Sequence, residues 1–141
     1  MGQLEKDIVE TAENFAENFK DKGSFDFSTC SLEEVDLLLE EMSDFIFDDE
    51  EAIYNTYTMV GCYVFEAARR SYGGEYYWIA EEQQPVLVIG EPDFCVSIKA
   101  WEKVKGRIIN GEEDNIPFYM AGLKECVEKG RATKGYSAEV I

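Results

Sequence analysis

The stretch from residue 50 to residue 71 constrains the fold more than any other part of the sequence. Its apolar residues recur at steps of four, three, four and three, the spacing of one helix face: Ile53, Tyr57, Val60, Val64 and Ala67. This stripe is widened by Met59, Cys62, Tyr63 and Ala68. A helix that is apolar over so wide an arc is usually covered on several sides. We therefore expect residues 50–71 to form the central helix.

The helical pattern recurs in four further segments, which are residues 3–20, 32–43, 99–110 and 116–130. Ser31 and Glu34 have the spacing of a capping box at the start of the second helix in the chain. The side chain of Asn115 is suited to capping the last helix, and Pro117 fits its first turn. The sequence thus predicts about five helices.

Three strands are predicted between residues 75 and 98, at 75–80, 86–89 and 94–98. The links between them are short, which favours antiparallel pairing because parallel strands need a long crossover. A chain of 141 residues has the length of one domain. The predicted fold class is α+β, a single domain over residues 1–130 in which the helices surround a small antiparallel three-stranded meander. Residues 131–141 are expected to form a flexible tail, unless Tyr136, Val140 or Ile141 docks on a sheet edge.

Net charge is the strongest constraint on function. The chain has 30 acidic and 13 basic residues, which gives −17. Nucleic acid and anionic membranes repel such a chain, because phosphate binding depends on Lys and Arg. No stretch has the pattern of a secretory signal or a membrane span, so we expect a cytoplasmic protein. Two interpretations of the acidity stay open: it keeps the protein soluble, or it forms a face for a basic protein partner.

The residue types of the common catalytic sites are scarce. The chain has no histidine, which excludes Ser-His, Cys-His and His-metal chemistry. We expect no cofactor and no metal, because no nucleotide-binding motif occurs and the cysteines form no C-x-x-C pair. Reduced thiols are expected instead for all four cysteines, Cys30, Cys62, Cys95 and Cys126. Cys62, Cys95 and Cys126 follow apolar patterns and are expected to pack in the core. Carboxylate chemistry stays open, although paired acids discriminate little among 30 acidic residues.

The stretch YVFEAARRSYGGEYYW, residues 63–78, is the candidate site. Glu66 and Arg70 have the four-residue spacing that stabilises a helix surface, and Gly73-Gly74 suits a helix end. A plain helix-to-strand junction explains every residue of the stretch. Arginine and exposed aromatic residues are also typical of interface hot spots, so the alternative is a partner-binding site formed by Glu66, Arg69, Arg70, Tyr72, Tyr76 and Trp78. The only basic patch, Lys99, Lys103 and Arg107, is expected to be a solvated face or an internal counterweight to the acidic surface.

The order of these parts resembles a family of small uncharacterised bacterial proteins. The resemblance spans about residues 27–125 and depends on Glu66 and Arg70, the glycine pair, Trp78, the Lys103/Arg107 helix, the Asn110-Gly111 pair and the IPFY segment. Val64-Phe65 stands where that family usually has Leu-Gly, and Asn115 stands where it usually has Ser. The resemblance implies an α+β fold and a bacterial origin, and it supplies no catalytic residues.

Taken together, these patterns favour a non-catalytic interaction protein, of immunity or adaptor type, that binds a basic protein partner. A homodimer is also expected to be compatible with the fold, because an open three-stranded sheet has edges to cover. The alternative from another class is a small carboxylate-dependent hydrolase. A pocket with two or more inward-facing acids would favour the hydrolase, whereas a flat acidic face would favour partner binding.

Overall fold

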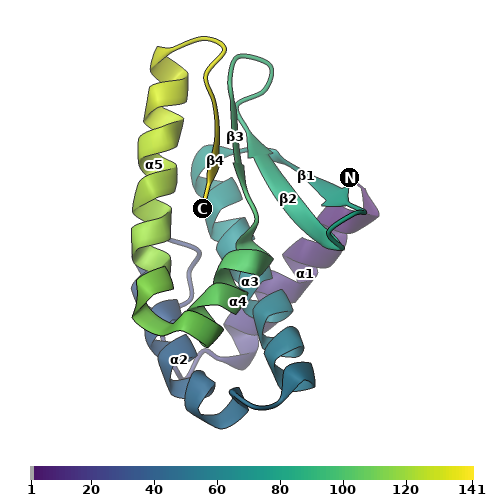
Figure 1. Cartoon of the computed structure of the whole chain (residues 1–141), viewed down its shortest axis with the longest axis vertical. Coiled ribbons are helices and arrows are strands. Elements are labelled where there is room, and N and C mark those ends of the chain that lie inside the picture. The colour runs from purple at the N-terminus through teal and green to yellow at the C-terminus, as the bar shows by residue number, and fades with distance from the viewer. Residues whose placement is uncertain (1) are drawn as a thin grey trace.

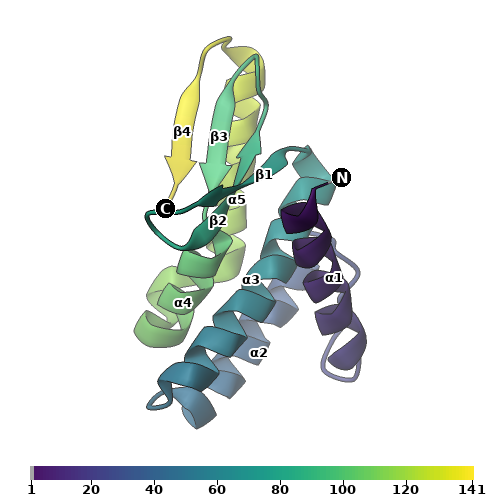
Figure 2. The same cartoon turned by 90° about the vertical axis from the view of Figure 1, so that its right-hand side faces the viewer.

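The helix predicted from the wide apolar stripe is the centre of the molecule. In a computed structural model, which describes residues 2–141, α3 (Glu50–Tyr72) is buried without interruption from Val60 to Ala68. On its flanks pack α1 (Gln3–Asn18), α2 (Ser31–Ile46) and α4 (Ala100–Asn110). Figure 2 shows α1, α2 and α3 as a helical layer, with the sheet at the opposite end of the molecule from the α2–α3 turn. The α+β class is therefore confirmed.

The sheet has four strands in the order β1 (Glu75–Ile79), β2 (Gln84–Ile89), β3 (Cys95–Ile98) and β4 (Ser137–Val140). The first three pair antiparallel, as predicted, whereas β4 pairs parallel with β3. The predicted antiparallel meander of three strands is therefore present, but the prediction lacked the fourth strand and its parallel pairing. Parallel pairing is available because α4, the short 3-10 helix η1 (Gly111–Asp114) and α5 (Ile116–Ala132) provide the long crossover.

The C-terminal segment pairs with the sheet, so the flexible tail predicted for residues 131–141 is corrected in favour of the alternative, docking on a sheet edge. After α5 ends at Ala132, the amide of Cys95 donates to the carbonyl of Tyr136 at 2.8 Å, and the amide of Gly135 donates to Asp93 at 2.7 Å. Figure 1 shows β4 between α5 and β3. The short strand alternates exposed and half-buried residues, which suits an edge position. Its pairing covers the β3 edge, leaving β1 and β4 at the edges; the homodimer stays a prediction.

The helix starts agree only partly with the capping predictions. Asn115 accepts a hydrogen bond from the amide of Phe118 at 2.8 Å, so the predicted cap of α5 is confirmed. The capping box is wrong, because Ser31 is already inside α2 and its hydroxyl donates to the Ser28 carbonyl at 2.7 Å. Glu34 instead accepts from the amide of Ser24, in the loop before the helix. Both side chains thus anchor that loop.

Among residues 2–141, no helix is both long enough and apolar enough to cross a bilayer.

Candidate partner-binding site

Four of the six candidate residues converge on one buried carboxylate. The side chain of Glu66 has no exposed surface. Arg69 donates to both of its oxygens, from Nε at 2.6 Å and from Nη2 at 2.8 Å. Arg70 adds a bond from Nε at 3.1 Å, and the hydroxyl of Tyr76 donates at 2.7 Å. Both carboxylate oxygens are therefore occupied by protein donors.

Local geometry explains this convergence. Arg69 and Arg70 follow Glu66 by three and four residues, so all three side chains share one side of α3. Tyr76 arrives from β1 because the chain reverses at two glycines with positive φ, Gly73 at 81° and Gly74 at 117°. A Cβ on Gly74 would lie 2.6 Å from the Val88 carbonyl oxygen, so the close approach of β1 and β2 needs glycine there.

The two arginines also bind the first helix to this cluster. Arg69 lies 3.8 Å from the carboxylate of Glu5, and Arg70 lies 3.8 Å from that of Glu13. The guanidinium of Arg70 stacks over the ring of Phe27 at 3.7 Å from the centroid. The cluster therefore joins α1, α3, β1 and the loop before α2, which indicates a structural clamp.

Electrostatics support the same interpretation of the Glu66 cluster. Burial raises the pKa of the Glu66 carboxyl, but the hydrogen bonds from Arg69, Tyr76 and Arg70 together outweigh it and leave that pKa below its usual range. Burial and the neighbouring carboxylate raise the pKa of Tyr76, so its hydroxyl keeps its proton and donates. A group that stays ionised with both oxygens engaged is a poor general acid. Helical spacing identified the Glu66–Arg70 pair, but Glu66 is fully buried, and only Arg70, whose side chain is 36% exposed, reaches the surface.

The other two candidates lie elsewhere. Tyr72 lines a small hollow against α5, together with Cys30, Met120 and Lys124. Trp78 is two residues beyond Tyr76 on the same face of β1, but its ring packs edge-on against Trp101 of α4 at 6.0 Å between centroids. The predicted six-residue set is therefore divided between three places, and Trp78, 47% exposed, is the member that belongs to an open surface.

Trp78 ends a row of four contacting rings that we name the aromatic strip: Tyr54, Tyr57, Trp101 and Trp78. Their centroids follow one another at 5.4, 6.5 and 6.0 Å, with each pair edge-to-face. The strip crosses α3, α4 and β1, and its two ends are the most open, with Tyr54 52% exposed. Sequence reasoning found only Trp78, because rings on three separate elements share no local pattern. The strip is the largest exposed aromatic row that these ring contacts define.

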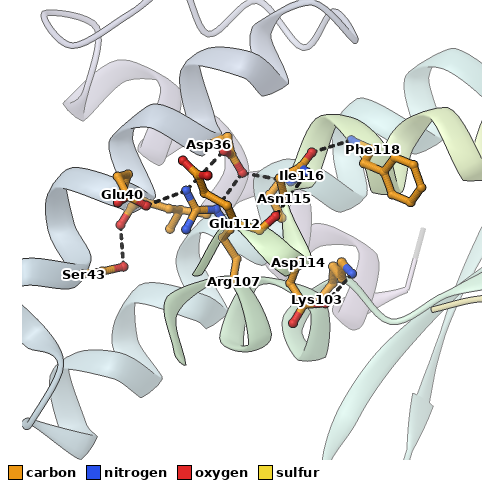
Figure 3. A network of polar contacts seen from close by, with 11 residues as sticks. Asp36, Glu40, Ser43, Lys103, Arg107, Glu112, Asp114, Asn115, Ile116 and Phe118 are labelled. Atoms are coloured by element: carbon orange, nitrogen blue, oxygen red, sulfur yellow. Dashed lines mark hydrogen bonds and ion pairs between the residues drawn. The ribbon is translucent and has the colours of Figure 1, made fainter. Parts of the chain in front are cut away.

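The predicted basic patch is mostly internal. Arg107 is 2% exposed, and its Nε donates to Asp36 at 2.9 Å while its Nη2 donates to Glu40 at 2.8 Å (Figure 3). Asp36 also accepts from the amide of Ile116 at 2.9 Å, so one carboxylate ties α2 to α4 and to the start of α5. Lys103 pairs with Asp114 at 2.8 Å. These contacts fit the prediction that the basic residues neutralise acidic residues of the chain. They do not fit the alternative of a solvated basic face.

Acidic side chains dominate the exterior. Glu66 is the only buried acid among the residues that the structure describes. No Lys or Arg occurs between Lys22 and Arg69, so all charged residues of α2, and of α3 up to Ala68, are acidic. Phe45, in the last turn of α2, and Phe47, just after it, are 80% and 71% exposed. They lie beside the acidic run Asp48, Asp49, Glu50 and Glu51. The stretch between Lys22 and Arg69 is therefore the part of the chain whose charged residues are all acidic, although acids also occur along the rest of the sequence.

A half-enclosed hollow of about 230 Å³ lies between α4, η1 and β4, and it is a candidate place for carboxylate chemistry. Three acids line it: Glu102, Asp114 and Glu139. Two of them are paired with lysines, Asp114 with Lys103 at 2.8 Å and Glu139 with Lys99 at 3.2 Å. Hydrogen bonds from Lys103 and from an asparagine amide hold the pKa of Asp114 below its usual range. The hollow thus contains carboxylates, but the lowered pKa of Asp114 keeps that carboxyl ionised and makes it a poor general acid.

The cysteines and possible metal ligands add little to the chemistry of the site. Burial raises the pKa of the Cys62 thiol to about 11, so it is protonated at neutral pH and packs as an apolar group. Within residues 2–141, His, Cys, Asp and Glu form no group of three or more placed to hold a metal ion. Cys95 and Cys126 are half-buried, while Cys30 is exposed, so the predicted core packing fits Cys62 best.

No family model, curated protein or solved structure matches this chain.

Proposed function

We propose that this chain is a non-catalytic binding protein of immunity or adaptor type, working in a bacterial cytoplasm, whose partner is a basic protein. The observation that carries the proposal is the separation of charge between interior and exterior. Acids outnumber basic residues by 30 to 13, and 29 of the acids lie at least partly at the surface, since only Glu66 is buried. An acidic exterior attracts a basic partner over distances of about a Debye length and speeds encounter.

The basic side chains strengthen this asymmetry because several are withdrawn from solvent. The side chains of Arg69, Lys99, Lys103 and Arg107 are exposed by 27%, 19%, 12% and 2%, each against a carboxylate. These cations are already paired with carboxylates of the chain and are poorly placed to meet an external anion. The exterior is accordingly more uniform in sign than the net charge alone indicates, which supports a cationic partner.

For the alternative hydrolase, the hollow lined by Glu102, Asp114 and Glu139 is the candidate site. A carboxylate-based hydrolase needs one carboxyl with a raised pKa as general acid, and the pKa of Asp114 is lowered instead. Lysines already neutralise two of the three acids. These observations favour binding over catalysis.

The experiment that tests the proposed function is capture from an extract of the source organism at graded NaCl concentrations. The immobilised chain is compared with an unrelated immobilised protein of similar net charge. We expect a specific partner with a basic isoelectric point, retained at low salt and released as salt rises. Recovery of no specific protein at any salt concentration would overturn the proposal, as would a specific partner that is acidic.

A further inference from the structure

The aromatic strip concentrates the residue types that carry binding energy in protein interfaces. Both tryptophans of the chain, Trp78 and Trp101, belong to it, together with Tyr54 and Tyr57. Tryptophan and tyrosine are enriched at hot spots because they supply large contact areas and lose little side-chain freedom on binding. A monomer that leaves Trp78 47% exposed and Tyr54 52% exposed in one row offers a surface for a partner.

A hollow lies in the middle of the strip. It has a volume of about 190 Å³ and is lined by Tyr57 and Trp101, with Gln83, Glu82 and Lys105 around them. Drug-sized ligands usually occupy pockets of roughly 300–1,000 Å³. The hollow is therefore of a size for one side chain of a larger partner rather than for a whole small molecule.

The charges around the strip select a cationic side chain. Glu50 and Glu51 lie one helical turn before Tyr54, and Glu81 follows Trp78 in the β1–β2 turn. Two more acids, Glu82 and Glu102, line the hollow itself; Glu82 is paired with Lys99 at 3.0 Å, which leaves Glu102 as the acid there without a lysine partner in the described part of the chain. The face of an aromatic ring attracts cations, and arginine stacks on it while forming hydrogen bonds with carboxylates. Rings flanked by acids are thus complementary to arginine.

One contact within the chain already shows this preference. The ammonium group of Lys105 lies 5.8 Å from the centroid of Tyr57, over the ring face. Lys105 therefore occupies the position that a partner's cation would take, and its charge opposes a basic segment. Removing that charge should strengthen binding.

We propose that the aromatic strip docks an extended, arginine-bearing segment of the partner protein, with one arginine side chain in the hollow beside Tyr57 and Trp101. This inference rests on the proposed function and names the surface that performs it. A second copy of the chain is disfavoured as the occupant, because two surfaces rimmed by acids repel each other. Single-stranded nucleic acid is disfavoured as well, because its stacked bases are accompanied by phosphates that need a basic groove, whereas glutamates flank this strip.

Short synthetic peptides that alternate glycine with arginine, lysine or glutamine are the probes for the docking test. Binding is followed through tryptophan emission, which reports on the strip alone because both tryptophans lie in it. We expect the tryptophan emission to change saturably with the arginine peptide and, at higher concentrations, with the lysine peptide. The glutamine peptide should leave the emission unchanged. An equal response to all three peptides, or no response to the arginine peptide, contradicts the proposal.

Three variants locate the binding, measured by anisotropy of the labelled arginine peptide. Trp78→Ala should weaken binding about fivefold, the worth of one exposed cation–π contact. Lys105→Gln should strengthen it about two- to fivefold. The matched control is Phe118→Ala, which removes a 75% exposed ring of α5 outside the strip and should change nothing. Equal losses in Trp78→Ala and Phe118→Ala, or weaker binding in Lys105→Gln, overturn the assignment.

The captured partner separates failure of the docking surface from failure of the proposed function. If Trp78→Ala and Lys105→Gln bind that partner like the wild type, the strip is not the docking surface, although the chain still binds a basic protein. If no basic partner is captured at all, the proposed function fails as well.

Discussion

Glu66 and Arg107 are the two charged side chains that the described part of the chain buries. Each is compensated by more than one partner, as a buried charge requires. Glu66 accepts from Arg69, Arg70 and Tyr76, while Arg107 donates to Asp36 and Glu40. Helical spacing alone predicted the Glu66–Arg70 contact. It did not predict burial, because the covering hydroxyl comes from β1 and depends on how the sheet folds back over α3.

Replacing Glu66 by glutamine tests whether the cluster is a structural clamp. The variant keeps the shape but removes the charge that compensates Arg69 and offers an amide donor where acceptors are needed. We expect a loss of about 2–3 kcal/mol in the free energy of unfolding, the scale of hydrogen bonds to charged groups. Urea denaturation measures it.

Glu13→Gln is the matched control for Glu66→Gln. Glu13 also faces Arg70, at 3.8 Å, but its side chain is 59% exposed. We expect Glu13→Gln to lower the free energy of unfolding by less than about 0.5 kcal/mol, because exposed ion pairs contribute little to stability. Equal effects of the two substitutions would show that burial of Glu66 has no energetic role.

The lowered pKa of Glu66 predicts an acid-dependent part of stability. Because its folded-state pKa lies below the ordinary value of 4.5, its stabilisation is fully present above that pH and is lost as the pH falls through the folded pKa. The stability difference between wild type and Glu66→Gln should therefore be constant from about pH 7 to pH 5 and shrink below. Urea midpoints across this range measure it, and a difference that grows on acidification contradicts the assignment.

At the scale of elements, the helices and the first three strands were predictable from local patterns, and the last strand was not. The wide apolar stripe identified residues 50–71, and α3 spans Glu50–Tyr72. The strand β4 was missed because Ser137–Val140 is only four residues long and its partner is set by the α4–α5 crossover. The aromatic strip was missed for a related reason, since its rings meet only after α3, α4 and β1 have packed.

The link between α2, α4 and α5 depends on the planar guanidinium of Arg107. Arg107→Lys keeps the charge but cannot donate to Asp36 and Glu40 in the same forked geometry. We expect a loss of about 2 kcal/mol in unfolding free energy, because a hydrogen bond to a charged group is lost in a buried site. Thermal and urea unfolding measure it.

The same substitution at Arg131, an exposed residue of the last turn of α5, is the control for Arg107→Lys. We expect a change within about 0.5 kcal/mol, as for most surface positions. If Arg107→Lys is as mild as Arg131→Lys, the three helices are held by apolar packing and not by this network.

At the scale of the whole molecule, the sequence already predicted an acidic protein. The structure adds the positions of the basic side chains and the carboxylates with which they pair. Arginines and lysines pair with carboxylates inside and between elements, and the α2–α3 layer carries acids without any basic residue between Lys22 and Arg69. No local pattern in the sequence distinguishes a cation that is paired inside from one that faces solvent. The acidic exterior is thus a property of the fold as well as of the composition.

The most direct test is the association rate constant of the captured partner, measured by stopped-flow at increasing ionic strength. Attraction between an acidic surface and a basic partner predicts that this rate falls by about tenfold or more between roughly 50 mM and 500 mM NaCl, as screening shortens the range of the field. A rate that stays constant over that range would contradict the account, because the acidity would then have no part in recognition.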